Sequence, residues 1–230
     1  MLGTPKTLRV KKSFNRLSDE IFSKIGDAPT NFIADAMEGR GVLDYKIKSI
    51  VPNARIVGSA LTAECCPGDN LGVLAALDYL KSGDVLMISV SKNKNQAVLG
   101  DRVASVIKKN GASGIVCDGL IRDLDDLLKI NIPCFCRGIT PRSAGSRGPG
   151  AVGLQVNLGG QVVNSGDLIV ADNDGVIVVP QNDIKEMLSN LNEVRIKENQ
   201  IQNTIFENTN RISMIKKRFP NIDNDTEFID

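Results

Sequence analysis

The order of strand-like and helix-like segments constrains the fold of this chain most strongly. Up to residue 137, apolar strand-like segments alternate with helical ones, and after it short strands follow one another in pairs. Strands are expected at residues 47–51, 55–64, 85–90, 114–117 and 132–136, and hairpins at 154–163 and 167–179. Alternation favours parallel strands joined by helices, whereas a hairpin pairs its strands antiparallel. We therefore predict an α/β fold, a sandwich of helices on a mixed sheet, rather than an all-parallel doubly wound sheet.

Helical segments separate these strands and also close the chain. Capping residues and helix stops predict helices at 18–26, 29–37, 71–80, 103–109, 124–129 and 180–202. The chain has 230 residues, enough for one large domain or two small ones, and no linker or internal repeat divides it. We expect an N-terminal arm and helix at 1–28, a single domain at 29–202, and a C-terminal appendage at 203–230.

The composition excludes several classes of partner. The formal net charge is +1, and aromatic residues make up 4% of the chain, with no Trp. Proteins that bind nucleic acid rely on a basic surface and often on aromatic stacking, so we expect no nucleic-acid partner. No apolar run approaches the ~20 residues that span a bilayer, so we expect no membrane segment. The N-terminus lacks the apolar core of a signal peptide, and the expected location is cytoplasmic.

The chain contains no histidine. This absence excludes Ser-His-Asp and Cys-His catalysis, and it excludes zinc, iron or copper sites built on histidine. The five cysteines lack the spacing of zinc ligands, so buried free thiols are expected. An acid or base must then be a carboxylate, Lys, Tyr, Cys or metal-bound water, and a metal bound by oxygen ligands would be Mg²⁺ or Mn²⁺.

Two short motifs carry the polar groups that suit an acidic ligand. Gly100 and Asp101 open a helix, whose first N–H groups are free to bind an anion. Asp118 ends an apolar strand, and Arg122 and Asp123 precede the next helix. A guanidinium can bind a carboxylate through two hydrogen bonds, and carboxylates can hold a hard divalent cation. If the fold brings the two motifs together, they can form one site.

Motifs along most of the chain resemble one family. They are Ala34-Asp35-Ala36-Met37, Gly58-Ser59-Ala60-Leu61-Thr62, Pro67-Gly68-Asp69-Asn70, Ser82-Gly83-Asp84-Val85-Leu86, Gly100-Asp101, Asp118-Gly119 with Arg122-Asp123, Arg137-Gly138-Ile139-Thr140-Pro141, and Gly166-Asp167 with Asp172-Asp174-Gly175-Val176. In this order they resemble the RraA-like family, which includes 4-hydroxy-4-methyl-2-oxoglutarate aldolases and the RNase E activity regulator. The resemblance implies a swivelling β/β/α-type fold assembled as a homotrimer or hexamer. It also implies a class II aldolase, a lyase that uses a divalent metal, releases pyruvate and in many members decarboxylates oxaloacetate.

The resemblance assigns roles to the substrate-binding residues. In the family pattern, the segment Gly100, Asp101, Arg102 and Val103 binds the pyruvate part of a small oxo-acid substrate, and Arg122 binds its carboxylate. Asp101 and Arg122 are the expected catalytic residues. Active aldolases usually have two apolar residues after Gly-Asp, whereas this chain has Arg102 and Val103. The Arg102 side chain could bind a second carboxylate, crowd the site or stay in solvent.

The resemblance also implies a metal site. Asp123 would anchor Mg²⁺, Mn²⁺ or another divalent cation, partly through water, and Asp101 would position a metal-bound water. Glu198, on the C-terminal helix of a neighbouring subunit, would assist. Each residue also has a plainer interpretation: a helix N-terminal ion pair for Arg122 and Asp123, a helix cap for Asp101, and a charged helix surface for Glu198.

The expected function is a divalent-metal-dependent aldolase or decarboxylase acting on a 4-hydroxy-2-oxo diacid or oxaloacetate. The alternative is a non-enzymatic regulator of the RraA type that binds an RNase or a helicase. Regulatory members often lack the Arg-Asp pair, and the intact Arg122 and Asp123 favour the enzyme.

Overall fold

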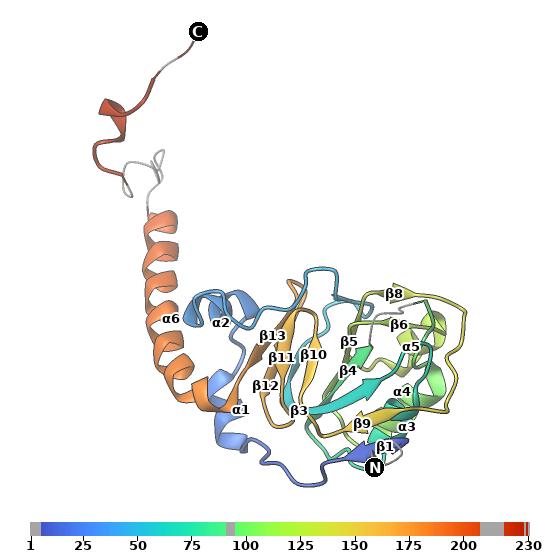
Figure 1. The fold of residues 1–230 in the computed structure, drawn as a ribbon. Coiled ribbons are helices and arrows are strands. Elements are labelled where there is room, and N and C mark those ends of the chain that lie inside the picture. Colours follow the sequence, from blue (N-terminus) through green and yellow to red (C-terminus); the bar gives the residue numbers. More distant parts are fainter. Residues whose placement is uncertain (1–5, 91–94, 208–218, 228, 230) are drawn as a thin grey trace, which may run out of the picture. The chain divides into compact units, whose positions relative to one another are not determined.

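The structure is a computed structural model that describes residues 6–90, 95–207, 219–227 and 229 (Figure 1). It comprises two compact units, residues 1–191 and 192–230. The second unit contains the end of helix α6 (Ile184–Glu207) and the 3₁₀ helix η2 (Ile222–Asn224). The predicted domain boundaries stay predictions, and residues 208–218, 228 and 230 of the predicted appendage lie outside the described residues. Among the described helices, none is both long and apolar enough to cross a membrane.

A mixed sheet forms the centre of the first unit. Its nine strands among the described residues are β1 (Leu8–Val10), β2 (Lys48–Ser49), β3 (Ile56–Cys65), β4 (Asp84–Val90), β5 (Gly114–Cys117), β7 (Cys134–Cys136), β9 (Gly150–Val152), β12 (Leu168–Ala171) and β13 (Val176–Val179). The strand order is β1-β9-β3-β4-β5-β7-β2, and β12 pairs with both β3 and β13. Strands β3, β4, β5 and β7 run parallel, whereas β12 is antiparallel to its two partners. The predicted mixed sheet is therefore confirmed.

Apolar side chains alternate between the two faces of the central strands. In β4, Leu86 and Ile88 pack into one core, and Val85 and Met87 pack into another. The first core is completed by α3 (Leu71–Ala76), α4 (Asp101–Lys109) and α5 (Leu124–Ile130), and the second by the hairpin of β10 (Val156–Leu158) and β11 (Gln161–Val163). Because side chains point to opposite faces with a period of two, both faces of the sheet are buried. The sheet thus lies between a helical layer and a β layer, as the predicted sandwich requires (Figure 1).

The remaining elements of the first unit are short. They are α1 (Asp19–Ile25), α2 (Thr30–Ala36), the 3₁₀ helix η1 (Gln181–Asp183), and the parallel pair β6 (Leu120–Ile121) and β8 (Gly138–Ile139). Several predicted ends were wrong. The helix predicted at 71–80 ends at Ala76, the strands predicted at 47–51 and 132–136 shorten to β2 and β7, and the last helix continues past 202. Local propensity marks an element, but packing against neighbours decides where it ends.

A buried ion pair ties the segment before α1 to the sheet. Asp84, whose side chain is 1% exposed, accepts hydrogen bonds from Arg16 Nε at 2.7 Å and Arg16 Nη2 at 2.8 Å. The Lys81 N–H donates to the same carboxylate at 2.8 Å, and Arg16 Nη2 also donates to the Tyr79 carbonyl at 3.1 Å. Removing one partner of such a pair leaves a buried charge without compensation.

We expect Arg16→Leu to lower the free energy of unfolding by about 3–5 kcal/mol, because the Asp84 carboxylate then stays buried without its cation. Arg9→Leu is the matched control. Arg9 lies 3.9 Å from Glu64, and these side chains are 66% and 45% exposed, so the expected loss is about 1 kcal/mol or less. Urea unfolding followed by circular dichroism measures both variants. Equal losses would contradict the buried role of Arg16.

Candidate active site

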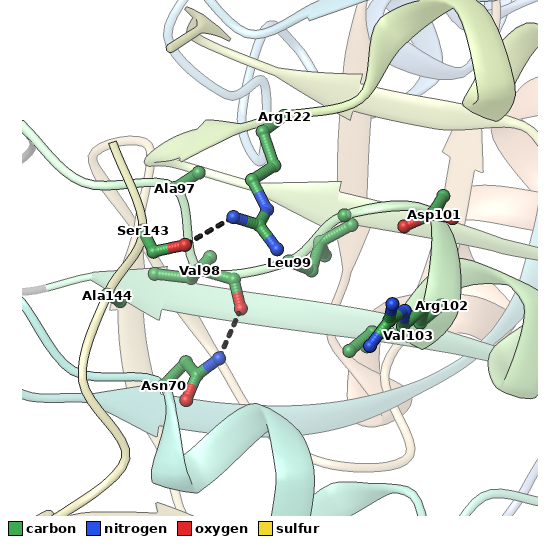
Figure 2. A pocket seen from close by; sticks show the side chains of 11 residues that line it. Asn70, Ala97, Val98, Leu99, Asp101, Arg102, Val103, Arg122, Ser143 and Ala144 are labelled. Carbon is green, nitrogen blue, oxygen red and sulfur yellow. Dashed lines mark hydrogen bonds between the residues drawn. The ribbon is translucent and has the colours of Figure 1, made fainter. Parts of the chain in front are cut away.

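A cavity of about 130 Å³ lies where the N-terminus of α4 meets the segment after β6. Four parts of the sequence line it: Asn70, then Ala97, Val98, Leu99, Gly100, Asp101, Arg102 and Val103, then Arg122, then Ser143 and Ala144. Figure 2 shows Arg122, Asp101 and Arg102 among the side chains around it. Pockets for drug-sized ligands occupy about 300–1,000 Å³. The cavity therefore suits a molecule of only a few carbon atoms.

Backbone hydrogen bonds bring the Gly-Asp and Arg-Asp motifs to this cavity. The Val98 N–H donates to the Leu120 carbonyl at 3.0 Å, and the Arg122 N–H donates to the Leu99 carbonyl at 3.1 Å. The segment that leads into α4 thus lies beside the segment that leaves β6. The two motifs are close in space, and the chemical roles assigned to their side chains stay predictions.

Helix α4 presents free N–H groups to the cavity. Gly100 is its N-cap, and its carbonyl accepts the first hydrogen bond of the helix from the Ala104 N–H at 3.0 Å. The Asp101 N–H donates to Asp123 Oδ2 at 3.3 Å. The N–H groups of Arg102 and Val103 have no hydrogen-bond partner among the described residues. First-turn N–H groups at the positive end of a helix dipole are suited to bind an anion.

Arg122 and Asp123 contact each other at the start of α5. Arg122 Nε lies 3.3 Å from Asp123 Oδ2, and the two side chains are 41% and 33% exposed. Asp123 has φ 62° and ψ 46°, a left-handed conformation. This conformation is unfavourable for most residues and concentrates at functional sites. The backbone of Asp123 is therefore held in an uncommon state beside the cavity.

Gly100 leaves the space that this pair occupies. A Cβ atom on Gly100 would lie 2.1 Å from Asp123 Oδ2 and 3.0 Å from Arg122 Cγ. The Gly100 backbone, with φ −142° and ψ −161°, is extended and open to any residue. Glycine is thus required here by the close approach of Asp123 and not by backbone conformation.

The loop before β9 supports Arg122. The Ala97 N–H donates to the Arg142 carbonyl at 2.7 Å, and the Ala144 N–H donates to the Ala97 carbonyl at 3.1 Å. These bonds place Ser143, whose hydroxyl accepts a hydrogen bond from Arg122 Nη1 (Figure 2). The sequence did not indicate Ser143, because a serine in a Gly- and Pro-rich loop carries no local signal of function.

Asn70 is a second cavity residue to which the sequence assigned no role. It occupies the N-cap position of α3 but makes no capping hydrogen bond with its side chain. Its Nδ2 instead donates to the Val98 carbonyl at 3.2 Å (Figure 2). Its Oδ1 accepts a hydrogen bond from the Ser146 hydroxyl at 2.7 Å. Because an asparagine at a helix start usually caps that helix, only the tertiary structure shows that Asn70 joins two other segments.

Comparison with known proteins agrees with the motif pattern. The family described as RraA-like, Aldolase/RraA, matches residues 25–178. The chain belongs to the RraA-like family. A protein of Halalkalibacterium halodurans named "Putative 4-hydroxy-4-methyl-2-oxoglutarate aldolase" is 38% identical over 160 residues, which cover 70% of this chain and 76% of the relative.

Two solved structures share the RraA-like fold. An uncharacterized protein from Pseudomonas syringae has a TM-score of 0.75 and 29% identity, over 86% of this chain and 97% of that chain. An unusual member of the RNase ES inhibitor RraA protein family from Streptomyces coelicolor also has a TM-score of 0.75, with 26% identity, over 83% and 99% of the two chains. The predicted family and fold class are confirmed.

Asp123 is the candidate metal ligand of this RraA-like site, and Asp101 is the candidate residue that would position a metal-bound water. Among the described residues, no group of three or more His, Cys, Asp or Glu side chains could hold a metal ion. Mg²⁺ binds proteins through one or two carboxylates and keeps waters and ligand oxygens in its other positions. One carboxylate, that of Asp123, therefore suits a hydrated Mg²⁺ or Mn²⁺ whose other positions hold water and a bound acid. It does not suit a structural zinc site, which needs four protein ligands.

Two neighbouring acidic residues are engaged elsewhere. Asp118 is buried, accepts a hydrogen bond from the Val90 N–H at 2.7 Å, and does not line the cavity. Asp126 is exposed and pairs with Lys129 at 2.8 Å. Neither carboxylate adds a ligand to the site of Asp101 and Asp123.

Burial makes the cysteines poor nucleophiles. All five lie in the described residues and are free thiols, and four of them are buried, as expected, while Cys66 is partly exposed. Burial raises the pKa of Cys65 to about 12 and that of Cys136 to about 11, and it also raises the pKa of Cys66. Because the thiolate is the nucleophilic form, a raised pKa makes these three cysteines poor candidates for a catalytic nucleophile.

The last predicted site residue lies in the other unit. Glu198 is part of α6, within residues 192–230, and its role at the cavity of a neighbouring subunit stays a prediction. The other predicted residues do gather at one place: Gly100, Asp101, Arg102, Val103 and Arg122 line the cavity, and Asp123 contacts Arg122.

Proposed function

We propose that this RraA-like protein is a divalent-metal-dependent class II aldolase or decarboxylase that releases pyruvate from a 4-hydroxy-2-oxo diacid or from oxaloacetate. The observation that carries the proposal is that Arg122 and the α4 N-terminus line one small cavity and that Asp123 contacts both of them. The 38% identical relative named as an aldolase supports the same reaction class. A 2-oxo acid needs donors for its carboxylate and a cation for its keto oxygen, and the site offers groups suited to both.

The donor side of the cavity suits the carboxylate of a 2-oxo acid. Arg122 directs Nη1 to Ser143 and Nε to Asp123, which leaves Nη2 without a partner among the described residues. The N–H groups of Arg102 and Val103 add two neutral donors at the positive end of the helix dipole. A carboxylate held by these groups has a fixed orientation relative to the acidic side of the cavity.

The acidic side suits a cation and a proton transfer. Asp123 would hold the cation together with water and the bound acid, and Asp101 would position a metal-bound water. Bound there, Mg²⁺ or Mn²⁺ supplies Lewis-acid stabilisation of the negative charge of the pyruvate enolate that both reactions leave. In the aldol cleavage, the half-buried Asp101 carboxylate accepts the proton of the 4-hydroxyl group, directly or through a water. The bond between C3 and C4 then breaks, C4 becomes a carbonyl carbon, and the electron pair of the bond passes to the pyruvate enolate. Asp101 returns the proton to C3, which becomes the pyruvate methyl group.

Arg122→Ala is expected to raise KM for the oxo acid by at least about tenfold, because a hydrogen bond to a charged group contributes about 1.5–3 kcal/mol. Arg122→Lys keeps the charge but loses the planar fork, so its KM should lie between those of the wild type and Arg122→Ala. Arg142→Ala is the matched control, since Arg142 is exposed, adjoins Ser143 and does not line the cavity. Pyruvate release coupled to lactate dehydrogenase measures all four proteins. A wild-type KM in Arg122→Ala would contradict the assigned role.

A regulator that binds an RNase or a helicase is the second candidate, supported by the structural neighbour from the RNase ES inhibitor RraA family. A regulator needs a protein-binding surface and not an intact cavity. Arg122→Ala and Asp123→Asn therefore separate the two functions. If the protein is an enzyme, both variants lose turnover, and if it is a regulator, both variants still bind the partner protein. Specific capture of an RNase or helicase by the wild type and both variants, without metal-dependent turnover, would decide for the regulator.

We also propose that the protein is a cytoplasmic homo-oligomer, a trimer or a hexamer, without a nucleic-acid or membrane partner. The family resemblance supports the assembly, in which Glu198 of one subunit would assist at the cavity of the next. Sedimentation equilibrium gives the number of subunits. A monomer at assay concentrations with full activity would remove Glu198 from the mechanism.

A further inference from the structure

The Arg102 side chain opposes a local preference of the helix that carries it. Arg102 is the second residue of α4, is exposed, and lines the same cavity as Arg122 (Figure 2). A cation in the first turn faces the positive end of the helix dipole, where acidic residues are preferred. Residues that break a local rule concentrate at functional sites. The position of Arg102 therefore indicates a role outside the helix itself.

On its own face of α4, Arg102 has no acidic neighbour. On a helix, residues three and four positions apart face each other, and those positions along α4 hold Ser105 and Val106. Asp101 is adjacent in sequence, and adjacent residues point to different sides of a helix. No ion pair joins Arg102 to another residue in the part of the chain that the structure describes. Its guanidinium is therefore available to an anion in the cavity.

We infer that Arg102 selects substrates that carry a second carboxylate. The inference rests on the proposed function, in which Arg122 and the free N–H groups of α4 bind the carboxylate of the 2-oxo acid. The Arg102 guanidinium then binds the carboxylate at the far end of the same molecule. Two guanidinium groups on one cavity of about 130 Å³ match a short ligand with two negative charges. The preferred substrates are short 2-oxo diacids rather than monoacids of equal length.

Two other roles for Arg102 lead to different results. A side chain that crowds the cavity would weaken every ligand, so its truncation would strengthen the binding of diacids and monoacids alike. A side chain that only stays in solvent would change neither. Direct contact with the far carboxylate is the one role that changes the binding of diacids alone.

Calorimetric titration in the presence of Mg²⁺ tests the inference without turnover. The probes are 2-oxoglutarate and 2-oxopentanoate, which have the same carbon chain and differ in the far carboxylate. Arg102→Leu is expected to weaken the binding of 2-oxoglutarate by about tenfold and to leave that of 2-oxopentanoate unchanged. Arg102→Lys should recover part of the loss, because it restores the charge without the planar fork. The N–H group of residue 102 is present in all of these proteins.

Lys109→Leu is the matched control for the titration. It removes one cation from the last turn of the same helix, outside the cavity, and is expected to change the affinity for neither acid. Equal affinities of the wild type for the two acids, no binding of the diacid, or the same change for both acids in Arg102→Leu would overturn the inference.

A turnover experiment separates the failure of this inference from failure of the proposed function. It compares a 4-hydroxy-2-oxo diacid with 4-hydroxy-2-oxopentanoate, which has the same bond to break and no far carboxylate. Arg102→Leu is expected to lower kcat/KM about tenfold for the diacid alone. If the wild type cleaves neither compound, the proposed function fails, and the titration still decides the role of Arg102. If both compounds are cleaved and Arg102→Leu keeps the wild-type selectivity, the role of Arg102 fails and the proposed function stands.

Discussion

Asp123→Asn is expected to abolish divalent-metal-dependent pyruvate release, with a loss in kcat/KM of at least about a hundredfold. Removing even an outer partner of a metal site typically costs about 10- to 100-fold, and Asp123 is proposed as the anchor of the cation itself. Asparagine has the same shape and, like aspartate, tolerates the left-handed conformation of residue 123. The variant therefore removes a charge and preserves the start of α5.

Asp126→Asn is the matched control for this variant. Asp126 lies three residues further along, is exposed and pairs with Lys129 at 2.8 Å. The same substitution there should leave kcat/KM within about twofold, because an exposed ion pair contributes little. Pyruvate release is measured with Mg²⁺, with Mn²⁺ and with EDTA, and metal affinity by calorimetry. Wild-type turnover in Asp123→Asn, or undiminished wild-type turnover in EDTA, would remove Asp123 or the metal from the mechanism.

Gly100→Ala is expected to lower kcat/KM by about a hundredfold with little change in the free energy of unfolding. The added Cβ would lie 2.1 Å from Asp123 Oδ2, so the carboxylate has to move. The extended backbone at Gly100 accepts alanine, and a carboxylate at the end of a side chain can shift without unfolding the protein. A displacement of about 1 Å at a reacting group can cost about a hundredfold in rate.

Gly145→Ala provides the comparison for Gly100→Ala. Gly145 adjoins the cavity residue Ala144, but a Cβ atom there would meet nothing closer than 3.7 Å. The activity of Gly145→Ala should therefore equal that of the wild type. Kinetics with Mg²⁺ and thermal unfolding are measured on both variants. Full activity in Gly100→Ala would mean that the Asp123 carboxylate can move freely, which contradicts its role as a fixed anchor.

Local sequence patterns were sufficient to place most of the elements that build the sheet. Strands β4 and β5 form in the apolar runs that predicted them, and β10–β11 and β12–β13 form the two predicted hairpins. Apolar runs and turn residues act over a few consecutive positions, so one sequence reveals them. The order of the strands in the sheet could not be predicted in this way. The segment Leu8–Val10 pairs with Gly150–Val152, and no local signal joins segments that are so far apart.

The sequence by itself determined which chemical groups the site can use. It provides a glycine and an aspartate at one helix start, an arginine and an aspartate at the next, and no histidine anywhere. Without histidine, an acid or base must be a carboxylate, Lys, Tyr, Cys or metal-bound water, and one sequence reveals this because the type of a side chain is a property of one position.

Only the tertiary structure decided which of these groups meet. It added Asn70 and Ser143 to the cavity, placed the Arg102 side chain on its lining, and left Asp118 bound to the Val90 N–H instead. A cavity depends on hydrogen bonds between segments that are distant in sequence, such as the bond from the Arg122 N–H to the Leu99 carbonyl. Such bonds form between backbone groups that all residue types except proline carry, so the residue types along the chain do not reveal them.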